Sequence, residues 1–421
     1  MLDLDLRFAA RPRLRAPAAL TCALLALSLG ASGCDDGDGE GAGGDAAARS
    51  DAALNLDAGG EVGPGDAGGD RGPGTDLGTD AEPDAELPPP MPFERVLLDR
   101  ARITSRGDDA NFHNVRSPLD FGRGPFAQAT LTIDLDTTCF PFEQWRDDPP
   151  PAGHNWPPQC DAFDRNFEVA IDDPEVEGDP PGFEVMRAIT PFGGPSRHVI
   201  DLTDFANARP GLHRVRVHVT TYSDGAGQVS GSDGGWFITA TLAVTPGTPP
   251  RPVTAVIPLF DGWIGEADRP ENLPFTVPPG TTEARVEYRV TGHGGGAPRA
   301  GIDNCIGPAE EFCQRQHIVY FDARREPPFI PWRTDCAEGC TRAIAPEFIG
   351  GFEYCAENPT GSIRSVEAPR ANWCPGALTP PYTFSPAAWL TPGPHSFAFD
   401  VLDIHPEGRW RVSALVYLYG E

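Results

Sequence analysis

The segment Thr282-Glu-Ala-Arg-Val-Glu-Tyr-Arg-Val290 alternates between apolar and polar side chains. Because successive side chains of a β-strand point to opposite faces, this pattern predicts a strand with one buried face. Glycine and proline clusters separate such segments, and we expect no long helix, only one helical turn at residues 203–208. The sequence therefore predicts an all-β protein of antiparallel sheets. The same alternation occurs at residues 127–135, 212–219, 236–244, 397–402 and 409–418.

The alternating segments fall on both sides of Thr245-Pro-Gly-Thr-Pro-Pro-Arg-Pro252, a proline-rich stretch without alternation. We expect an N-terminal domain at residues 92–247 and a C-terminal domain at residues 248–421. Each has a size suited to a β-sandwich or jelly roll.

The first 34 residues have the pattern of an export signal. Arginines precede an apolar run at residues 18–29 that is too short to span a membrane. Ala31-Ser-Gly-Cys34 resembles a bacterial lipobox, in which Cys34 would be lipidated; an ordinary signal peptide is the alternative. We expect an exported protein, either secreted or held at the cell envelope by its lipid anchor alone.

Residues 35–91 form a Gly, Ala, Asp and Pro tract with fifteen acidic residues and two arginines. With almost no large apolar side chain to bury, such a segment cannot offset its ordering entropy, so a disordered acidic linker is predicted. The whole chain has a formal net charge of −28, and residues 92–421 keep about −17 of it. This acidity argues against a nucleic-acid partner, which requires a basic surface.

The chain contains no lysine, so its side-chain cations are arginine and histidine. Schiff-base chemistry, pyridoxal-type catalysis and phosphate binding by a P-loop lysine are therefore excluded.

Eight cysteines follow the linker, and an even number in an exported chain predicts disulfides. Eight cysteines permit 105 pairings, of which proximity along the chain favours the four local ones. A zinc site at Cys336 and Cys340 is the alternative, which an oxidising compartment disfavours. The expected pairs are Cys139–Cys160, Cys305–Cys313, Cys336–Cys340 and Cys355–Cys374.

Three cysteine-anchored loops carry charged side chains. The first loop is Cys160-Asp-Ala-Phe-Asp-Arg165, the second is Ala309-Glu-Glu-Phe-Cys313 followed by His317, and the third is Arg370-Ala-Asn-Trp-Cys-Pro-Gly376. Each alone is typical of a stapled turn. Together, in this order and spacing, they resemble the peptide-N-glycosidase F family over about residues 93–421.

The resemblance implies two eight-stranded antiparallel jelly rolls that lie side by side, with the active cleft at their interface. It implies a glycoprotein amidase that hydrolyses the glycosylated side-chain amide of asparagine and releases the N-glycan, without a cofactor or metal. The expected partners are N-glycosylated peptides or proteins, and we expect a monomer.

Residue by residue, the family's essential aspartate falls on Asp164, the expected base or nucleophile. One supporting glutamate falls on Glu311, which is expected to orient the chitobiose core or the water. Arg165 and Arg370 match family arginines and are expected to hold the carboxylates and polarise the carbonyl. Trp373, in the third loop, is expected to contact the substrate.

The sequence also departs from the family pattern. The second supporting glutamate falls on Thr220, and Tyr222 stands in place of a tryptophan. Removal of one oriented polar group typically costs roughly 10²–10³ in rate, and Asp224 is the nearby candidate to replace it. Ala309 stands in place of a cysteine, so Cys305 is the expected partner of Cys313.

Two other classes of function stay open at this point. His293 and His317 would supply imidazole ligands for copper, in an architecture similar to that of copper-dependent peptide monooxygenases. A non-catalytic surface lipoprotein would instead bind glycans or glycoproteins through exposed indole rings. The tryptophans considered for that role are Trp145, Trp156, Trp263 and Trp373.

Overall fold

The computed structural model describes residues 91–139, 144, 147–172, 182–295, 304–345, 351–386 and 390–420. The expected signal with Cys34, the linker up to residue 90, and Trp145 lie outside these ranges and stay predictions. Within the described part of the chain, no helix is long and apolar enough to cross a membrane.

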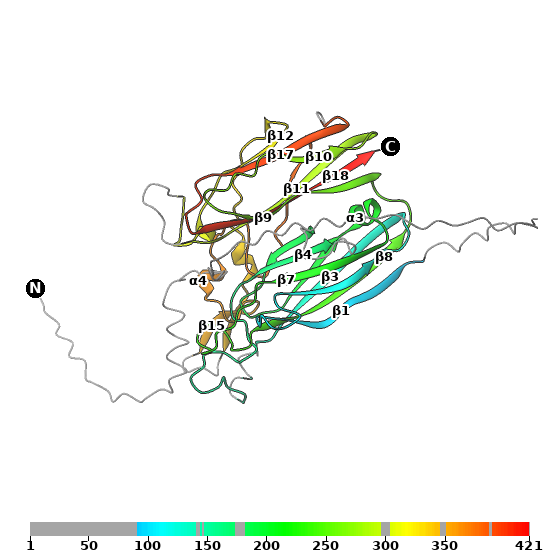
Figure 1. The fold of residues 1–421 in the computed structure, drawn as a ribbon. Helices are drawn as coiled ribbons and strands as arrows, with labels where there is room; N and C mark the ends of the chain where they lie inside the picture. Colours follow the sequence, from blue (N-terminus) through cyan, green and yellow to red (C-terminus); the bar gives the residue numbers. More distant parts are fainter. Residues whose placement is uncertain are drawn as a thin grey trace, which may run out of the picture. The chain divides into compact units, whose positions relative to one another are not determined.

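The first sandwich consists of two antiparallel four-stranded sheets (Figure 1), with the strand orders β1-β8-β3-β6 and β2-β7-β4-β5. The alternation predicted at residues 127–135 and 212–219 falls on β3 and β7, where buried and partly exposed residues alternate. The predicted helical turn is confirmed as α3 (Thr203–Ala208). The strands are β1 (Phe93–Thr104), β2 (Asn114–Asp120), β3 (Phe126–Thr137), β4 (Asn166–Asp172), β5 (Phe183–Ile189), β6 (Ser196–Asp201), β7 (Leu212–Val219) and β8 (Gly235–Pro246).

The second sandwich repeats this architecture with the strand orders β10-β17-β12-β13 and β16-β11-β18-β9, and a separate hairpin joins β14 to β15. The predicted all-β antiparallel class is therefore confirmed. The division at residues 247 and 248 stays a proposal, which the gap between β8 and β9 supports. The strands are β9 (Val253–Ile264), β10 (Leu273–Val277), β11 (Thr281–Gly294), β12 (His317–Phe321), β13 (Arg324–Arg325), β14 (Arg342–Ala345), β15 (Phe352–Cys355), β16 (Tyr382–Phe384), β17 (Gly393–Val401) and β18 (Gly408–Gly420).

Strand β18 is buried on both faces. Its alternation predicted one polar face in solvent, and this expectation is wrong. Val412 and Val416 pack in the core of the second sandwich, whereas Leu415, Tyr417 and Tyr419 pack against the core of the first. The face that reads as polar in the sequence is therefore the contact surface between the two sandwiches.

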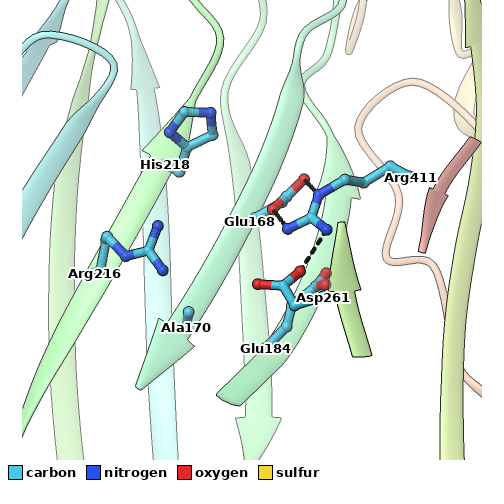
Figure 2. A pocket seen from close by; sticks show the side chains of 7 residues that line it. All are labelled: Glu168, Ala170, Glu184, Arg216, His218, Asp261 and Arg411. Atoms are coloured by element: carbon cyan, nitrogen blue, oxygen red, sulfur yellow. Dashed lines mark hydrogen bonds and ion pairs between the residues drawn. The ribbon is translucent and has the colours of Figure 1, made fainter. Parts of the chain in front are cut away.

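A buried charged cluster joins β18 to the first sandwich (Figure 2). The guanidinium of Arg411 donates from Nε and Nη2 to the two carboxylate oxygens of Glu168 on β4, at 2.9 and 2.8 Å, and also pairs with Asp261 on β9. Arg187 on β5 pairs with Glu184 and donates to the backbone carbonyl of Arg411. Two-pronged contacts of this kind fix orientation as well as distance, so they set how the two sandwiches meet.

The four disulfides confirm two of the expected pairs and correct the other two. Cys139–Cys160 and Cys305–Cys313 form as predicted. The others are Cys336–Cys374 and Cys340–Cys355, so the expected pairs Cys336–Cys340 and Cys355–Cys374 are wrong. The β14–β15 hairpin places Arg342 opposite Cys355, which brings Cys340 beside that cysteine.

A tryptic digest without reduction distinguishes the two connectivities. Because the chain has no lysine, trypsin cuts after arginine and releases residues 334–342 with Cys336 and Cys340, 343–364 with Cys355, and 371–409 with Cys374. We expect one cross-linked species of all three peptides in mass spectrometry. A free 334–342 peptide with an internal disulfide would contradict the structure.

Candidate active site

The first loop is organised around the buried carboxylate of Asp161. This carboxylate accepts hydrogen bonds from Nε of Arg165 at 2.9 Å, from the Thr221 hydroxyl at 2.7 Å and from the Tyr222 amide at 3.1 Å. The Cys139–Cys160 disulfide holds the adjoining backbone. Asp161 therefore ties the entry of β4 to the segment that follows β7, although sequence reasoning assigned it no role.

Asp164 and Arg165 differ in burial, as expected for neighbours at the start of a strand. Arg165 is buried, and its guanidinium lies 5.5 Å from the ring centre of Tyr222. Asp164 is half-buried. The aspartate is thus the member of the pair that has surface available for a reacting molecule.

In the second loop, two adjacent glutamates have different environments. Glu310 is buried and accepts hydrogen bonds from Arg315 and from the indole of Trp410 at 2.9 Å. Glu311 keeps 20% of its side chain exposed and pairs with Arg370. Glu310 therefore anchors the short 3₁₀ turn Glu310–Phe312, and Glu311 is the carboxylate left at the surface.

In the third loop, the guanidinium of Arg370 is fully buried. Its Nη2 donates to the carbonyl and the hydroxyl of Ser365 at 2.8 and 2.9 Å, and the Trp373 ring centre lies 4.3 Å from it. Trp373 is itself 1% exposed and donates from its indole to the Gly292 carbonyl at 2.9 Å. The expectation that Trp373 contacts the substrate therefore fails in this structure, because no ring surface is open to a ligand; the indole supports Arg370 from behind.

Hydrogen bonds link the first sandwich to the segment of the second that carries the third loop. The Gly376 amide donates to the Ile189 carbonyl at 2.9 Å, and the Phe192 amide donates to the Asn358 side chain at 2.9 Å. Thr360 donates to the carbonyl of Ala162 within the first loop. These contacts lie near both loops; Arg370 pairs with Glu311, and its positive charge also acts on Asp164.

Burial raises the pKa of the Asp164 carboxyl above its ordinary value. The positive charges of Arg370 and Arg165 act in the opposite direction, and the nearby carboxylate of Asp161 adds to the rise. Arg370 belongs to the second sandwich, yet its charge affects the pKa of Asp164 in the first. A carboxyl with a raised pKa beside guanidinium groups is suited to accept a proton during a reaction.

The Thr220 position lacks a carboxylate. The buried Thr220 hydroxyl has no hydrogen-bond partner within the residues that the structure describes. Asp224, the expected replacement, accepts hydrogen bonds from the backbone amides of Ala226, Gln228 and Val229, which lower its pKa. Its carboxylate caps a turn and does not replace the glutamate. Tyr222 is 48% exposed and stays available to a ligand.

The two histidines considered as copper ligands lie in separate aromatic clusters. His293 stacks on Trp373 and contacts the Thr291 hydroxyl at 2.8 Å, whereas His317 contacts the Tyr288 hydroxyl at 3.0 Å. Burial lowers the pKa of each to about 3, so both rings are neutral. In the described ranges no group of three or more His, Cys, Asp or Glu side chains is arranged to hold a metal ion.

Comparisons with known proteins bear on the family and the fold. Residues 265–418 match the family model described as "Peptide-N-glycosidase F, C terminal". No curated protein matches the sequence significantly. The second sandwich thus resembles the C-terminal part of that family.

Solved structures of that class have the same fold. A peptide-N(4)-(N-acetyl-β-D-glucosaminyl) asparagine amidase superposes with a TM-score of 0.56 at 18% identity, covering 78% of this chain and 96% of that chain. PNGase F, a glycosylasparaginase from Flavobacterium meningosepticum, gives 0.54 at 17%, with the same coverage. PNGF-II gives 0.53 at 17%, and the match spans 78% of this chain and 66% of that longer chain. The resemblance to the peptide-N-glycosidase F family and its two jelly rolls is confirmed.

Replacement of Asp161 tests its structural role. In Asp161→Ala, the buried guanidinium of Arg165 loses its partner, so we expect the free energy of unfolding to fall by about 3–5 kcal/mol, measured by urea denaturation. The control is Asp136→Ala, which removes an exposed pair with Arg100 and should cost less than about 1 kcal/mol. Equal losses in the two variants would contradict the assignment.

Proposed function

We propose that the protein is a glycoprotein amidase that hydrolyses the side-chain amide of glycosylated asparagine and releases the N-glycan. The observation that carries this proposal is that Asp164 and Glu311, both partly exposed, lie on loops of different sandwiches; Arg370 pairs with Glu311, and its charge acts on Asp164. The structural relatives are described as enzymes with this activity. The three loops resemble the family motifs, with Ala309 in place of a cysteine.

The reaction breaks the bond between the amide carbon and the glycosylated nitrogen. In the proposed mechanism, water adds to the amide carbon while Asp164 accepts a proton from it. The nitrogen then takes up a proton and departs with the glycan, which leaves aspartate in the peptide. Glu311 orients the water or the sugar, and its geometry is fixed by Arg370. Arg165 contributes positive charge beside the site where negative charge develops on the carbonyl oxygen.

We further propose that the protein works outside the cytoplasm as a monomer, tethered by lipid at Cys34. Four disulfides in the described residues fit an oxidising compartment, which supports export. The lipobox-like sequence supports the anchor, and the acidic tract after it would hold the catalytic body away from the membrane.

The decisive experiment is incubation of the full chain with an N-glycopeptide, followed by mass spectrometry. We expect release of the glycan together with conversion of asparagine to aspartate. Asp164→Asn should reduce the rate by about 10²–10⁴-fold, whereas Asp99→Asn, on the exposed surface of β1, should not change it. Unaltered turnover in Asp164→Asn would sink the mechanism, and binding without conversion would favour a glycan-binding protein.

A second variant restores the family's glutamate. Because the Thr220 hydroxyl has no hydrogen-bond partner among the described residues, Thr220→Glu adds a carboxylate without breaking a hydrogen bond of this hydroxyl. We expect kcat/KM to rise by about 10²-fold. Thr220→Gln has the same size without the charge and should give no such gain. If both variants keep the melting temperature and neither changes the rate, this position does not limit catalysis.

A further inference from the structure

Trp263, near the end of β9, presents a large aromatic surface to solvent. It is 42% exposed, and it belongs to neither of the two sandwich cores. The other tryptophans that the structure describes are used in packing: Trp236, Trp373 and Trp410 are fully buried, and Trp156 and Trp332 pack against hydrophobic clusters. Core formation therefore does not explain the indole at residue 263.

The register of the sheet places Trp263 on the side that faces the first sandwich. Trp263 lies opposite Arg411 in the β9–β18 ladder. Asp261, two residues earlier and therefore on the same face of the strand, contacts Arg411 and lines a water-sized pocket between the sandwiches (Figure 2). Trp263 thus lies on the same face of the sheet as the cluster of Arg411, Glu168 and Asp261.

A continuous series of packed side chains connects Trp263 to the candidate active site. The Trp263 ring meets His293 edge to face at 5.6 Å, and His293 stacks on Trp373 with its centre 5.6 Å away. Trp373 lies against Arg370, which pairs with Glu311. Trp263 is therefore the exposed end of a series that begins at a candidate catalytic carboxylate.

The middle of this series, His293, is uncharged and buried. His293 is buried, its pKa is lowered to about 3 by burial, and its Nε2 contacts the Thr291 hydroxyl. A neutral imidazole held on two sides fixes the edge of the Trp263 indole, so a ligand that stacks on the indole meets a prearranged surface. The exposed Arg409 lies opposite His293 in the β11–β18 ladder and reaches toward Gly265, two residues after Trp263.

We propose that Trp263 is a specificity-determining residue that stacks on a neutral sugar ring of the glycan, beyond the sugars nearest to asparagine. The apolar C–H face of a hexose or N-acetylhexosamine fits a flat indole, and Arg409 supplies hydrogen-bond donors to hydroxyl groups at its edge. The proposal rests on the proposed function and deepens it, because it sets which glycans are cleaved efficiently.

The test compares two glycopeptides with one peptide sequence, one carrying chitobiose and the other chitobiose extended by mannose residues. An aromatic stacking contact corresponds to about 2- to 13-fold in affinity. We expect Trp263→Ala to raise KM, and so to lower kcat/KM by that factor, for the extended glycan alone. Trp263→Phe should keep most of the wild-type kcat/KM for this glycan. Val199→Ala, an exposed apolar residue on β6, is the control and should change neither. An equal loss on both glycopeptides, or no loss on either, would overturn the proposal.

A binding measurement separates this proposal from the proposed function. Free mannose-extended oligosaccharide is titrated into the intact protein, and the Trp263 indole N–H signal is followed by NMR, with Trp263→Ala identifying the signal. A shift for the extended sugar but not for free chitobiose supports the subsite, even if no glycopeptide is cleaved and the amidase assignment fails. An unmoved signal refutes the subsite, even if the amidase is active.

Discussion

The buried contact between Arg411 and Glu168 is the constraint on which the site depends. It joins β18 of the second sandwich to β4 of the first, and β4 begins two residues after Asp164. Burial acts to raise the pKa of Glu168, but the charges of Arg411 and Arg187 outweigh it and hold the pKa at about 2. Glu168 is therefore ionised across the neutral range, and removal of Arg411 would take away the hydrogen-bonded partner of this buried charge.

Once the sandwiches are held in this way, their loops can share one reaction site. Disulfides staple all three loops, and buried partners hold the charged groups: Asp161 holds Arg165, and Ser365 with Trp373 holds Arg370. Asp164 and Glu311 are the carboxylates that keep surface for a substrate. Catalysis needs groups placed before the reaction begins, and stapled loops on a fixed interface provide that placement.

The sequence predicted the fold class because alternation directly reports a sheet with one buried face, as in β3 and β7. It missed β4 and β5, whose residues are buried on both faces, and it misassigned the polar face of β18, because a salt bridge between sandwiches has the same local pattern as a solvated surface. Local spacing could not pair Cys340 with Cys355, since the hairpin between them decides that contact. The role of Asp161 could not be predicted because its partners Thr221 and Tyr222 lie about sixty residues away in the sequence. Its position in the first loop could have marked it as a candidate residue.

The charge of Arg370 in the second sandwich acts on the Asp164 carboxyl in the first, and titration of that carboxyl by ¹³C NMR measures this influence. The pKa should lie above the ordinary aspartate value of about 3.9, because burial outweighs the guanidinium charges. Arg370→Gln removes a positive charge that favours the ionised form, so the pKa should rise further, whereas Arg364→Gln on the exposed face of α4 (Ile363–Val366) should leave it unchanged. An Asp164 pKa at or below the ordinary value, or one that Arg370→Gln does not move in a folded protein, would contradict the account.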